Sequence, residues 1–348
     1  MGSVVDSSFV IREPPFAQCH AATICQAGDR LLAAFFAGTR EGEPDVGIWL
    51  ARNRSGSWES VREVATGRSR ADTPLPCWNP VLFHPPDGPT LLFYKVGPDP
   101  AEWWGMLTHS RDFGETWSEP QRLPEGIWGP IKNKPVLMND GTLLCPTSGE
   151  ATGWQVFIQS TKDLGESWNS VGPLNDVTTI PAIQPTILDF PSGRLQLLCR
   201  TGQGLISSCR SEDGGTTWSP MVLTELPNPN SGIDASVLRD GRALLVYNHV
   251  GMAAGRWGGP RSPLNVAVSE DGTNWSAALV LEDEPGEYSY PSVIQSTDGK
   301  VHIVYTWRRE NVKHVVLDPI QLDSRPMHSA SWPPSSRRTA SGWTEQPY

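Results

Sequence analysis

Ser110-Arg-Asp-Phe-Gly-Glu-Thr-Trp117 decides the fold of this chain, because the same pattern returns in register further along the sequence. The other copies are Thr161-Lys-Asp-Leu-Gly-Glu-Ser-Trp168, Ser211-Glu-Asp-Gly-Gly-Thr-Thr-Trp218, the shorter Ser269-Glu-Asp-Gly-Thr-Asn-Trp275 and a worn copy, Asn53-Arg-Ser-Gly-Ser-Trp58. Asp can accept backbone N–H groups and Gly can take a positive φ, and a hairpin turn needs both properties. The pattern therefore predicts turns, with structural roles for Asp112, Asp163, Asp213 and Asp271.

A second repeat, a glycine followed by an apolar run, alternates with these turns. It occurs six times, with about 50–60 residues between successive copies, which is the period of propeller blades. The copies begin at Gly28, Gly88, Gly141, Gly193, Gly241 and Gly299. We therefore predict an all-β fold, a six-bladed β-propeller formed by residues 1–320 as a single domain.

The two ends of the chain have different expected roles. A propeller ring usually closes when a strand from one terminus completes a blade begun at the other, and Val4–Val10 is the candidate strand. Residues 323–348 are rich in Ser, Pro and Arg and show no periodicity. A segment of this composition buries little apolar surface, so we expect a mobile tail.

Composition limits the partners of the protein. The formal net charge is −10, whereas nucleic-acid binding needs a basic face, so we expect no nucleic-acid partner. A local pocket of Arg and Lys can still hold a small acidic substrate. No apolar run reaches the roughly 18 residues of a membrane span, and the first residues do not resemble a secretory signal. We expect no membrane partner and a cytoplasmic location, or a secreted one if a signal has been trimmed.

The cysteines and the known chemical motifs give no sign of a metal or cofactor. The six cysteines form no C-x-x-C pair, and most lie in strand-like sequence such as Leu197-Leu-Cys-Arg. Buried reduced thiols are the simplest interpretation, and disulfides or metal ligation are the alternatives. The sequence contains no H-E-x-x-H motif, phosphate-binding glycine loop or Gly-x-Ser-x-Gly elbow. We therefore predict no metal and no cofactor.

Several stretches outside the turns carry a family resemblance. They include Cys19-His-Ala-Ala-Thr, Pro76-Cys-Trp-Asn-Pro-Val, Ile183-Gln-Pro, Leu198-Cys-Arg-Thr and Tyr288-Ser-Tyr-Pro-Ser. With the repeats, they make residues 15–318 resemble the sialidase superfamily, and especially its BNR-repeat, or sialidase-like, proteins. Members of this group are often labelled sialidases. Some relatives look like enzymes that release rhamnose from a glucuronate by elimination.

The resemblance implies a set of site residues. A retaining sialidase uses three arginines to hold the substrate carboxylate, a tyrosine nucleophile activated by a glutamate, and an aspartate as acid/base. The residues that match are Arg200 and Arg261 for the second and third arginines, Tyr290 for the nucleophile, Asp45 near the acid/base loop, and Glu287 as the carboxylate nearest Tyr290. The first arginine is missing: its position reads Cys19-His20-Ala21, and Arg12 lies eight residues before His20.

His20 therefore has two interpretations, a hydrogen-bonded core group or a catalytic one. A neutral imidazole can act as general base or acid near neutral pH. In a β-elimination it would remove the proton α to a uronate carboxylate, or protonate the leaving sugar, with Tyr290 as the partner acid or base. The cation that stabilises the enolate-like carboxylate would come from Lys132, Lys134 or Arg200.

Four further polar or aromatic positions are candidates for substrate contact. They are Glu43, in the acidic loop of Glu41 and Asp45; Gln184, in an apolar Ile-Gln-Pro setting; Asn248; and Trp78, which can stack on a sugar ring. Each has a structural alternative: a solvated turn for Glu43, an inward hydrogen bond for Gln184, a loop contact for Asn248 and packing for Trp78.

The sequence thus favours an enzyme that cleaves a glycosidic bond at a carboxylate-bearing sugar, and within that class a His20-dependent uronate lyase of the rhamnosyl-glucuronate type. A retaining exo-sialidase is the first alternative. A cytosolic isomerase or cyclase acting on a small metabolite and a non-catalytic glycan-binding propeller are the others. The expected partner is a small acidic sugar or glycan end, or a small metabolite.

Overall fold

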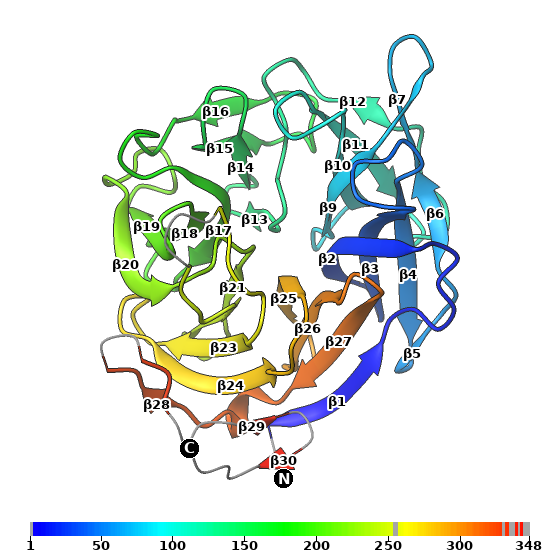
Figure 1. Cartoon of the computed structure of the whole chain (residues 1–348). Coiled ribbons are helices and arrows are strands. Elements are labelled where there is room, and N and C mark those ends of the chain that lie inside the picture. The colour runs from blue at the N-terminus through cyan, green and yellow to red at the C-terminus, as the bar shows by residue number, and fades with distance from the viewer. Residues whose placement is uncertain (1–2, 253–256, 329–330, 334–337, 340–341, 344–348) are drawn as a thin grey trace.

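Six antiparallel sheets stand around one axis as the blades of a propeller (Figure 1). The computed structural model describes residues 3–252, 257–328, 331–333, 338–339 and 342–343. Within these ranges the single helical element is a short 3-10 helix, η1 (Pro319–Gln321). The predicted all-β, six-bladed fold is therefore confirmed.

Each blade is a meander that runs outward from the axis. The innermost strands are β2 (Gln18–Ala27), β9 (Cys77–Phe83), β13 (Val136–Leu137), β17 (Ala182–Asp189), β21 (Asp234–Val237) and β25 (Tyr288–Gln295). The second strands are β3 (Arg30–Gly38), β10 (Thr90–Val96), β14 (Leu143–Gly149), β18 (Leu195–Thr201), β22 (Ala243–Tyr247) and β26 (Val301–Trp307). The third strands are β4 (Gly47–Arg54), β11 (Trp104–Ser110), β15 (Gln155–Thr161), β19 (Leu205–Ser211), β23 (Leu264–Ser269) and β27 (Asn311–Leu317).

The outer strands are shorter and more varied. They are β5 (Ser57–Trp58) with β6 (Arg62–Ala65), β12 (Gln121–Arg122), β16 (Asn169–Val171), β20 (Val222–Pro227), β24 (Ser276–Glu282) and β1 (Val4–Phe9). Two small hairpins stand outside the blades: β7 (Gly67–Arg68) with β8 (Pro74–Leu75), and β29 (Arg338–Thr339) with β30 (Gly342–Trp343).

The N-terminal strand closes the ring, as predicted. β1 pairs antiparallel with β27, from Val4 opposite Leu317 to Phe9 opposite Lys313. The last blade is therefore built from both ends of the chain, which joins the first and last parts of the sequence by a ladder of backbone hydrogen bonds.

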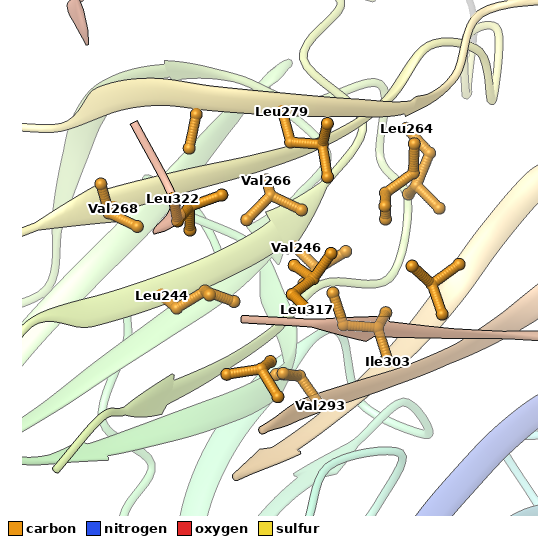
Figure 2. Packing of buried hydrophobic residues seen from close by; sticks show 14 of the residues in the cluster. Leu244, Val246, Leu264, Val266, Val268, Leu279, Val293, Ile303, Leu317 and Leu322 are labelled. Carbon is orange, nitrogen blue, oxygen red and sulfur yellow. The ribbon is translucent and has the colours of Figure 1, made fainter. Parts of the chain in front are cut away.

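Apolar layers between neighbouring blades form the core. Figure 2 shows one such layer, in which Leu244 and Val246 of β22 face Val293 and Ile303 of the next blade. All four side chains are fully buried. Burying a Val, Leu or Ile side chain contributes about 1.5–3 kcal/mol, so six such layers provide most of the stability of the ring.

The repeated turns join third to fourth strands. In the copy at residues 110–117, Asp112 accepts the backbone N–H of Thr116 at 2.8 Å and its hydroxyl at 2.6 Å. Ser110 receives the Gly114 N–H at 2.8 Å. The same bonds recur at Asp163, Asp213 and Asp271. These aspartates hold their own turns, which is the structural role that the repeat predicts.

All six cysteines are buried and free, as the sequence indicates. Of the expected tail, Arg325–Pro326 form β28, which pairs with β24, and Trp332 packs against the apolar cluster of blade five. Much of the rest of 323–348 lies outside the described residues, and the mobility of the tail stays a prediction. No helix in the described ranges has the length and hydropathy that a membrane span requires.

Candidate functional site

One end of the axis gathers the polar candidates, and we call this end the mouth. The innermost strands begin here, and the loops that follow the second strands converge here. Its linked residues are His20, Glu41, Gln184, Arg200, Arg261, Glu287, Tyr290 and Arg309.

Bulges at the start of the innermost strands aim side chains into the mouth. Ala21, Gln184 and Tyr290 have φ values of 55°, 54° and 52°, and each lies where the ladder register shifts. Left-handed backbone is uncommon outside glycine and costs of order 1 kcal/mol or more per residue. β-bulges often re-aim a side chain next to a site, so this repeated strain makes the mouth the candidate site.

Tyr290 presents its phenolic oxygen as an acceptor. Arg200 Nη1 donates to this oxygen at 2.9 Å and Gln184 Nε2 donates to it at 3.3 Å. The phenol donates to no side chain or carbonyl in the described part of the chain. The phenolic oxygen therefore accepts two hydrogen bonds, one of them from a cation.

Arg200 is a buried cation with neutral partners. Only 6% of the residue is exposed. Its guanidinium donates to Asn230 Oδ1 at 2.9 Å, to Gln184 Oε1 at 3.2 Å and to Tyr290. Among the described residues no carboxylate lies within salt-bridge distance of it. A buried guanidinium without a counter-ion favours the binding of an anion, and a carboxylate fits its planar fork.

Arg261 and Arg309 are the next cations of the mouth, and the Arg261 guanidinium lies 5.6 Å from the centroid of the Tyr290 ring. Glu287 joins them, because its carboxylate lies 3.3 Å from Arg261 Nη1 and 2.9 Å from Arg309 Nε. Arg309 also pairs with Glu41 at 2.6 Å. The backbone oxygen of Arg309 accepts the N–H of Cys19 at 2.8 Å, which places Arg309 beside the predicted slot of the missing arginine.

His20 lies behind Tyr290. It is 2% exposed, its Nδ1 lies 2.9 Å from Thr306 Oγ1, and its ring centroid is 4.3 Å from that of Tyr290. Burial, reinforced by Arg309, Arg261, Arg200 and Lys132, holds the pKa of His20 well below its usual range. His20 is therefore neutral, and a ligand in the mouth meets Tyr290 before it meets the imidazole.

The sequence profile of the BNR repeat-like domain matches residues 29–303, which is most of the chain. The chain belongs to this family. Solved structures similar to this BNR propeller include a protein of unknown function from Dyadobacter fermentans, with 16% identity, 90% and 98% coverage of the two chains and a TM-score of 0.73. The Hadza microbial sialidase Hz136 has 18% identity, coverage of 91% and 69%, and a TM-score of 0.72.

The intramolecular trans-sialidase from Ruminococcus gnavus is also similar, with 15% identity, coverage of 93% and 99%, and a TM-score of 0.68. At these identities the likeness shows the sialidase-like fold alone. No curated protein matches the BNR propeller significantly. The reaction has to be argued from the residues at the mouth.

The two candidate lysines lie below the mouth, where they join innermost strands. Lys132 is 3% exposed and donates to Asn133 Oδ1 at 2.9 Å, to Ile233 O at 2.7 Å and to the carbonyl of Pro291. Burial lowers the pKa of Lys132 to about 7. Lys134 pairs with the fully buried Asp234 at 2.9 Å. Both amino groups are engaged, so Arg200 is the better-placed cation of the three predicted.

Four other predicted site residues are held by hydrogen bonds or ion pairs within the protein. Asp45 accepts the N–H and hydroxyl of Thr39 at 2.8 and 2.6 Å, and the hydroxyl bond leads in lowering its pKa. Glu43 pairs with the exposed Arg40. Asn248 donates to the carbonyls of Pro263 and Tyr288, and Trp78 donates to Gly97 O at 2.8 Å. Their part in binding stays a prediction.

Two mouth residues of the BNR propeller escaped the sequence analysis, Arg309 and Glu150. Both lie just after the end of a second strand and Arg200 lies near the end of one, and the three lie seven to ten residues after a repeated glycine. This spacing after the repeated glycine could have identified them, because the second strand of each blade ends at the mouth. Arg12, in contrast, is exposed and forms no hydrogen bond or ion pair with any described residue.

A groove of about 910 Å³ lies elsewhere, between blades four and five at the rim. Leu226, Trp275 and Met327 are among its lining residues. It lacks the linked arginines and carboxylates of the mouth, so the mouth is the better candidate for the functional site. In the described ranges no three His, Cys, Asp or Glu side chains are grouped to hold a metal ion.

Proposed function

We propose that this protein is a carbohydrate-active enzyme that cleaves a glycosidic bond next to a uronate carboxylate by β-elimination. The observation that carries the proposal is Arg200, a cation 6% exposed that has no carboxylate within salt-bridge distance among the described residues. A carboxylate at the mouth would supply the missing negative charge. Hydrogen bonds to charged groups contribute about 1.5–3 kcal/mol each, enough to orient a small acidic sugar.

The three arginines are suited to the transition state of an elimination. When the proton α to a carboxylate is removed, negative charge moves onto the carboxylate oxygens and an enolate-like form develops. Arg200, with Arg261 and Arg309 on the other side of Tyr290, would stabilise that charge. Glu287 holds Arg261 and Arg309 in place, so these cations need not reorganise when the charge develops.

Tyr290 is the group that would take the proton from carbon. To act as the base it would have to start as the phenolate, and its oxygen accepts hydrogen bonds from Arg200 and Gln184. His20 packs against the ring from behind and stays uncharged. In this assignment His20 positions Tyr290 and is required for turnover, whereas Tyr290 touches the substrate.

The step balances without water. The C–H bond α to the carboxylate breaks and its proton passes to Tyr290, while the electron pair forms a carbon–carbon double bond. The bond from the adjacent carbon to the glycosidic oxygen breaks, and that oxygen receives a proton from an acid. The products are an unsaturated uronate and a free sugar, and the protein ends with its protons redistributed.

A retaining exo-sialidase is the second candidate, and the three arginines around one tyrosine favour it. That mechanism needs a carboxylate to take the phenolic proton. The side chain that bonds Tyr290 is instead the amide of Gln184, while Glu287 is engaged by Arg261, Arg309 and Ser289. An amide cannot act as that base, so elimination accounts better for the arrangement.

A parallel assay tests the proposal. The protein is incubated with sialyllactose and with an arabinogalactan oligosaccharide capped by rhamnosyl-glucuronate, and products are followed by ultraviolet absorbance and chromatography. Free rhamnose together with an unsaturated uronate is the expected result. Release of free sialic acid would support the sialidase mechanism in place of the lyase. The absence of product from either substrate would refute both mechanisms.

A further inference from the structure

Asn230 holds the guanidinium of Arg200 from the neighbouring blade. It lies in the loop that leads into β21, the innermost strand of blade five, and its φ is 58°. The residue is buried, and its side-chain oxygen Oδ1 accepts the Nε proton of Arg200 at 2.9 Å. Its side-chain nitrogen Nδ2 donates to the backbone oxygen of Trp257 at 2.7 Å. The amide of Asn230 therefore connects Arg200 to a second loop of the mouth.

The two partners of Asn230 fix the orientation of its amide. An arginine Nε can only donate a hydrogen bond, and a backbone carbonyl can only accept one. The amide oxygen therefore faces Arg200, and the amide nitrogen faces Trp257. An ionised aspartate, which has nearly the same shape, could accept from Arg200 but could not donate to Trp257. The position thus uses a neutral acceptor where a carboxylate would also fit the arginine.

The loop around Asn230 is held by hydrogen bonds that do not involve Arg200. Asn228 Oδ1 accepts the backbone N–H of Ser231 at 2.8 Å. Ser231 Oγ lies 2.7 Å from Asn248 Oδ1, to which it donates. All three of these residues are fully buried. The loop therefore presents Asn230 in a fixed place, and the guanidinium adapts to it.

The bond to Asn230 determines where the rest of the guanidinium points. Arg200 Nη1 donates to Gln184 Oε1 at 3.2 Å and to the Tyr290 oxygen at 2.9 Å. The plane lies over the Trp154 ring, with Cζ 5.5 Å from the ring centroid. The remaining nitrogen, Nη2, donates to none of the residues that the structure describes. Because the fork is planar, fixing Nε and Nη1 also fixes the direction of Nη2, which is left for a ligand.

We propose that Asn230 is a positioning residue that makes the mouth prefer a carboxylate to a neutral group. The inference rests on the proposed function, in which a uronate carboxylate binds Arg200. Asn230 orients the guanidinium through a neutral oxygen, so no carboxylate of the protein competes with the substrate for that cation. The orientation exists before the ligand arrives, which reduces the ordering that binding requires.

Two ligands that differ only in charge test this role. They are methyl glucuronide, a uronate without a leaving sugar, and the methyl ester of its carboxyl group. Dissociation constants are measured by calorimetry. We expect wild type to bind the acid about 10–10²-fold more tightly than the ester, as a charged hydrogen bond allows. Asn230→Asp gives Arg200 a carboxylate of the protein, so it should lose this preference and bind the ester within about three-fold of wild type.

A second variant separates charge from orientation. Asn230→Gly accepts the positive φ and removes both side-chain hydrogen bonds, but it adds no charge. It should bind the acid about 10-fold more weakly than wild type and still prefer the acid to the ester. Gln203→Glu is the matched control, because it adds the same charge at an exposed position three residues after Arg200. Solvent screens that charge, so the preference should stay within about three-fold of wild type.

The outcomes distinguish the inference from the function on which it rests. If Asn230→Asp keeps the wild-type preference, or loses affinity for acid and ester equally, Asn230 has no role in selecting the carboxylate, while the wild-type preference still supports a carboxylate at Arg200. A melting curve shows whether Asn230→Asp folds. If it does not, Asn230→Gly decides, and equal losses on both ligands overturn the inference. Wild type without a preference for the acid would overturn both the inference and the carboxylate site.

Discussion

The two ends of the propeller axis are built in different ways. At one end the same turn is repeated, with Asp112, Asp163 and Asp213 each accepting N–H groups from its own loop. At the other, unlike loops bring together Arg200, Tyr290 and the rest of the mouth, with contacts between residues some 90 positions apart. The repeated turns stabilise the blades, whereas the candidate site residues lie in loops that do not follow the repeat. Substitutions at the two ends should therefore have separable effects.

The largest effect should come from Tyr290→Phe. Removing the phenolic oxygen removes the proposed base but leaves the ring against His20, so kcat should fall by about 10³-fold with little change in the thermal midpoint. Steady-state kinetics on the uronate substrate and a melting curve by circular dichroism measure both. Full activity in this variant would remove Tyr290 from the mechanism.

The repeated turns could be predicted from the sequence, because each turn depends on residues that are close together in the chain. The Asp and Gly of each copy lie within a few positions of the groups they bond, so a pattern of eight letters carries the geometry. The mouth depends on distant pairs. Arg309 reaches Glu41 across the closure of the ring, and nothing local in Trp307-Arg-Arg-Glu indicates that partner.

The lysines show a second limit of the sequence. Lys132 and Lys134 have the charge that a carboxylate needs, and the sequence offers both as candidate cations. Which way an axial side chain points depends on neighbouring blades: Ile233 and Pro291 accept from Lys132, and Asp234 pairs with Lys134. The sequence alone therefore did not predict these contacts between blades.

Asp234→Ala tests a third region of the molecule, the buried ion pair that lies near the axis below the mouth. It removes a fully buried carboxylate that bonds Lys134, Thr186 and the Val293 N–H. Breaking a buried ion pair on one side destabilises by about 3–5 kcal/mol. Denaturant titration measures the change. Asp240→Ala, which breaks an exposed pair with Arg242, is the control and should cost no more than about 1 kcal/mol.

Acid should weaken the last blade before it affects the turns. His302 Nδ1 lies 2.9 Å from His314 Nε2, and burial lowers the pKa of both rings, that of His314 to about 3. The unfolded chain takes up protons below its ordinary histidine pKa of about 6.5 while the folded chain does not, so stability falls as pH decreases from there. We expect about 1 kcal/mol per pH unit from His314 below pH 6.5, and a contribution of the same sign from His302. Denaturant titrations from pH 7 to 5 test this, and the double variant His302→Gln with His314→Gln should flatten the dependence.

The smallest effect should come from the repeated end. Asp112→Ala removes the acceptor of the Thr116 bonds in one turn of several, so we expect the thermal midpoint to fall by only a few degrees. The kcat on the uronate substrate should stay within about two-fold of wild type, because the turn lies at the far end of the axis from the mouth. A loss of activity without a loss of stability would contradict the separation of the two ends.

The most direct test of the central claim is the mass of the uronate product after turnover in isotopically labelled water. Elimination breaks the bond without adding water, so the product should be unsaturated and carry no label. A saturated uronate, heavier than the unsaturated one by the mass of a water molecule, would show hydrolysis at the mouth and would contradict the lyase account.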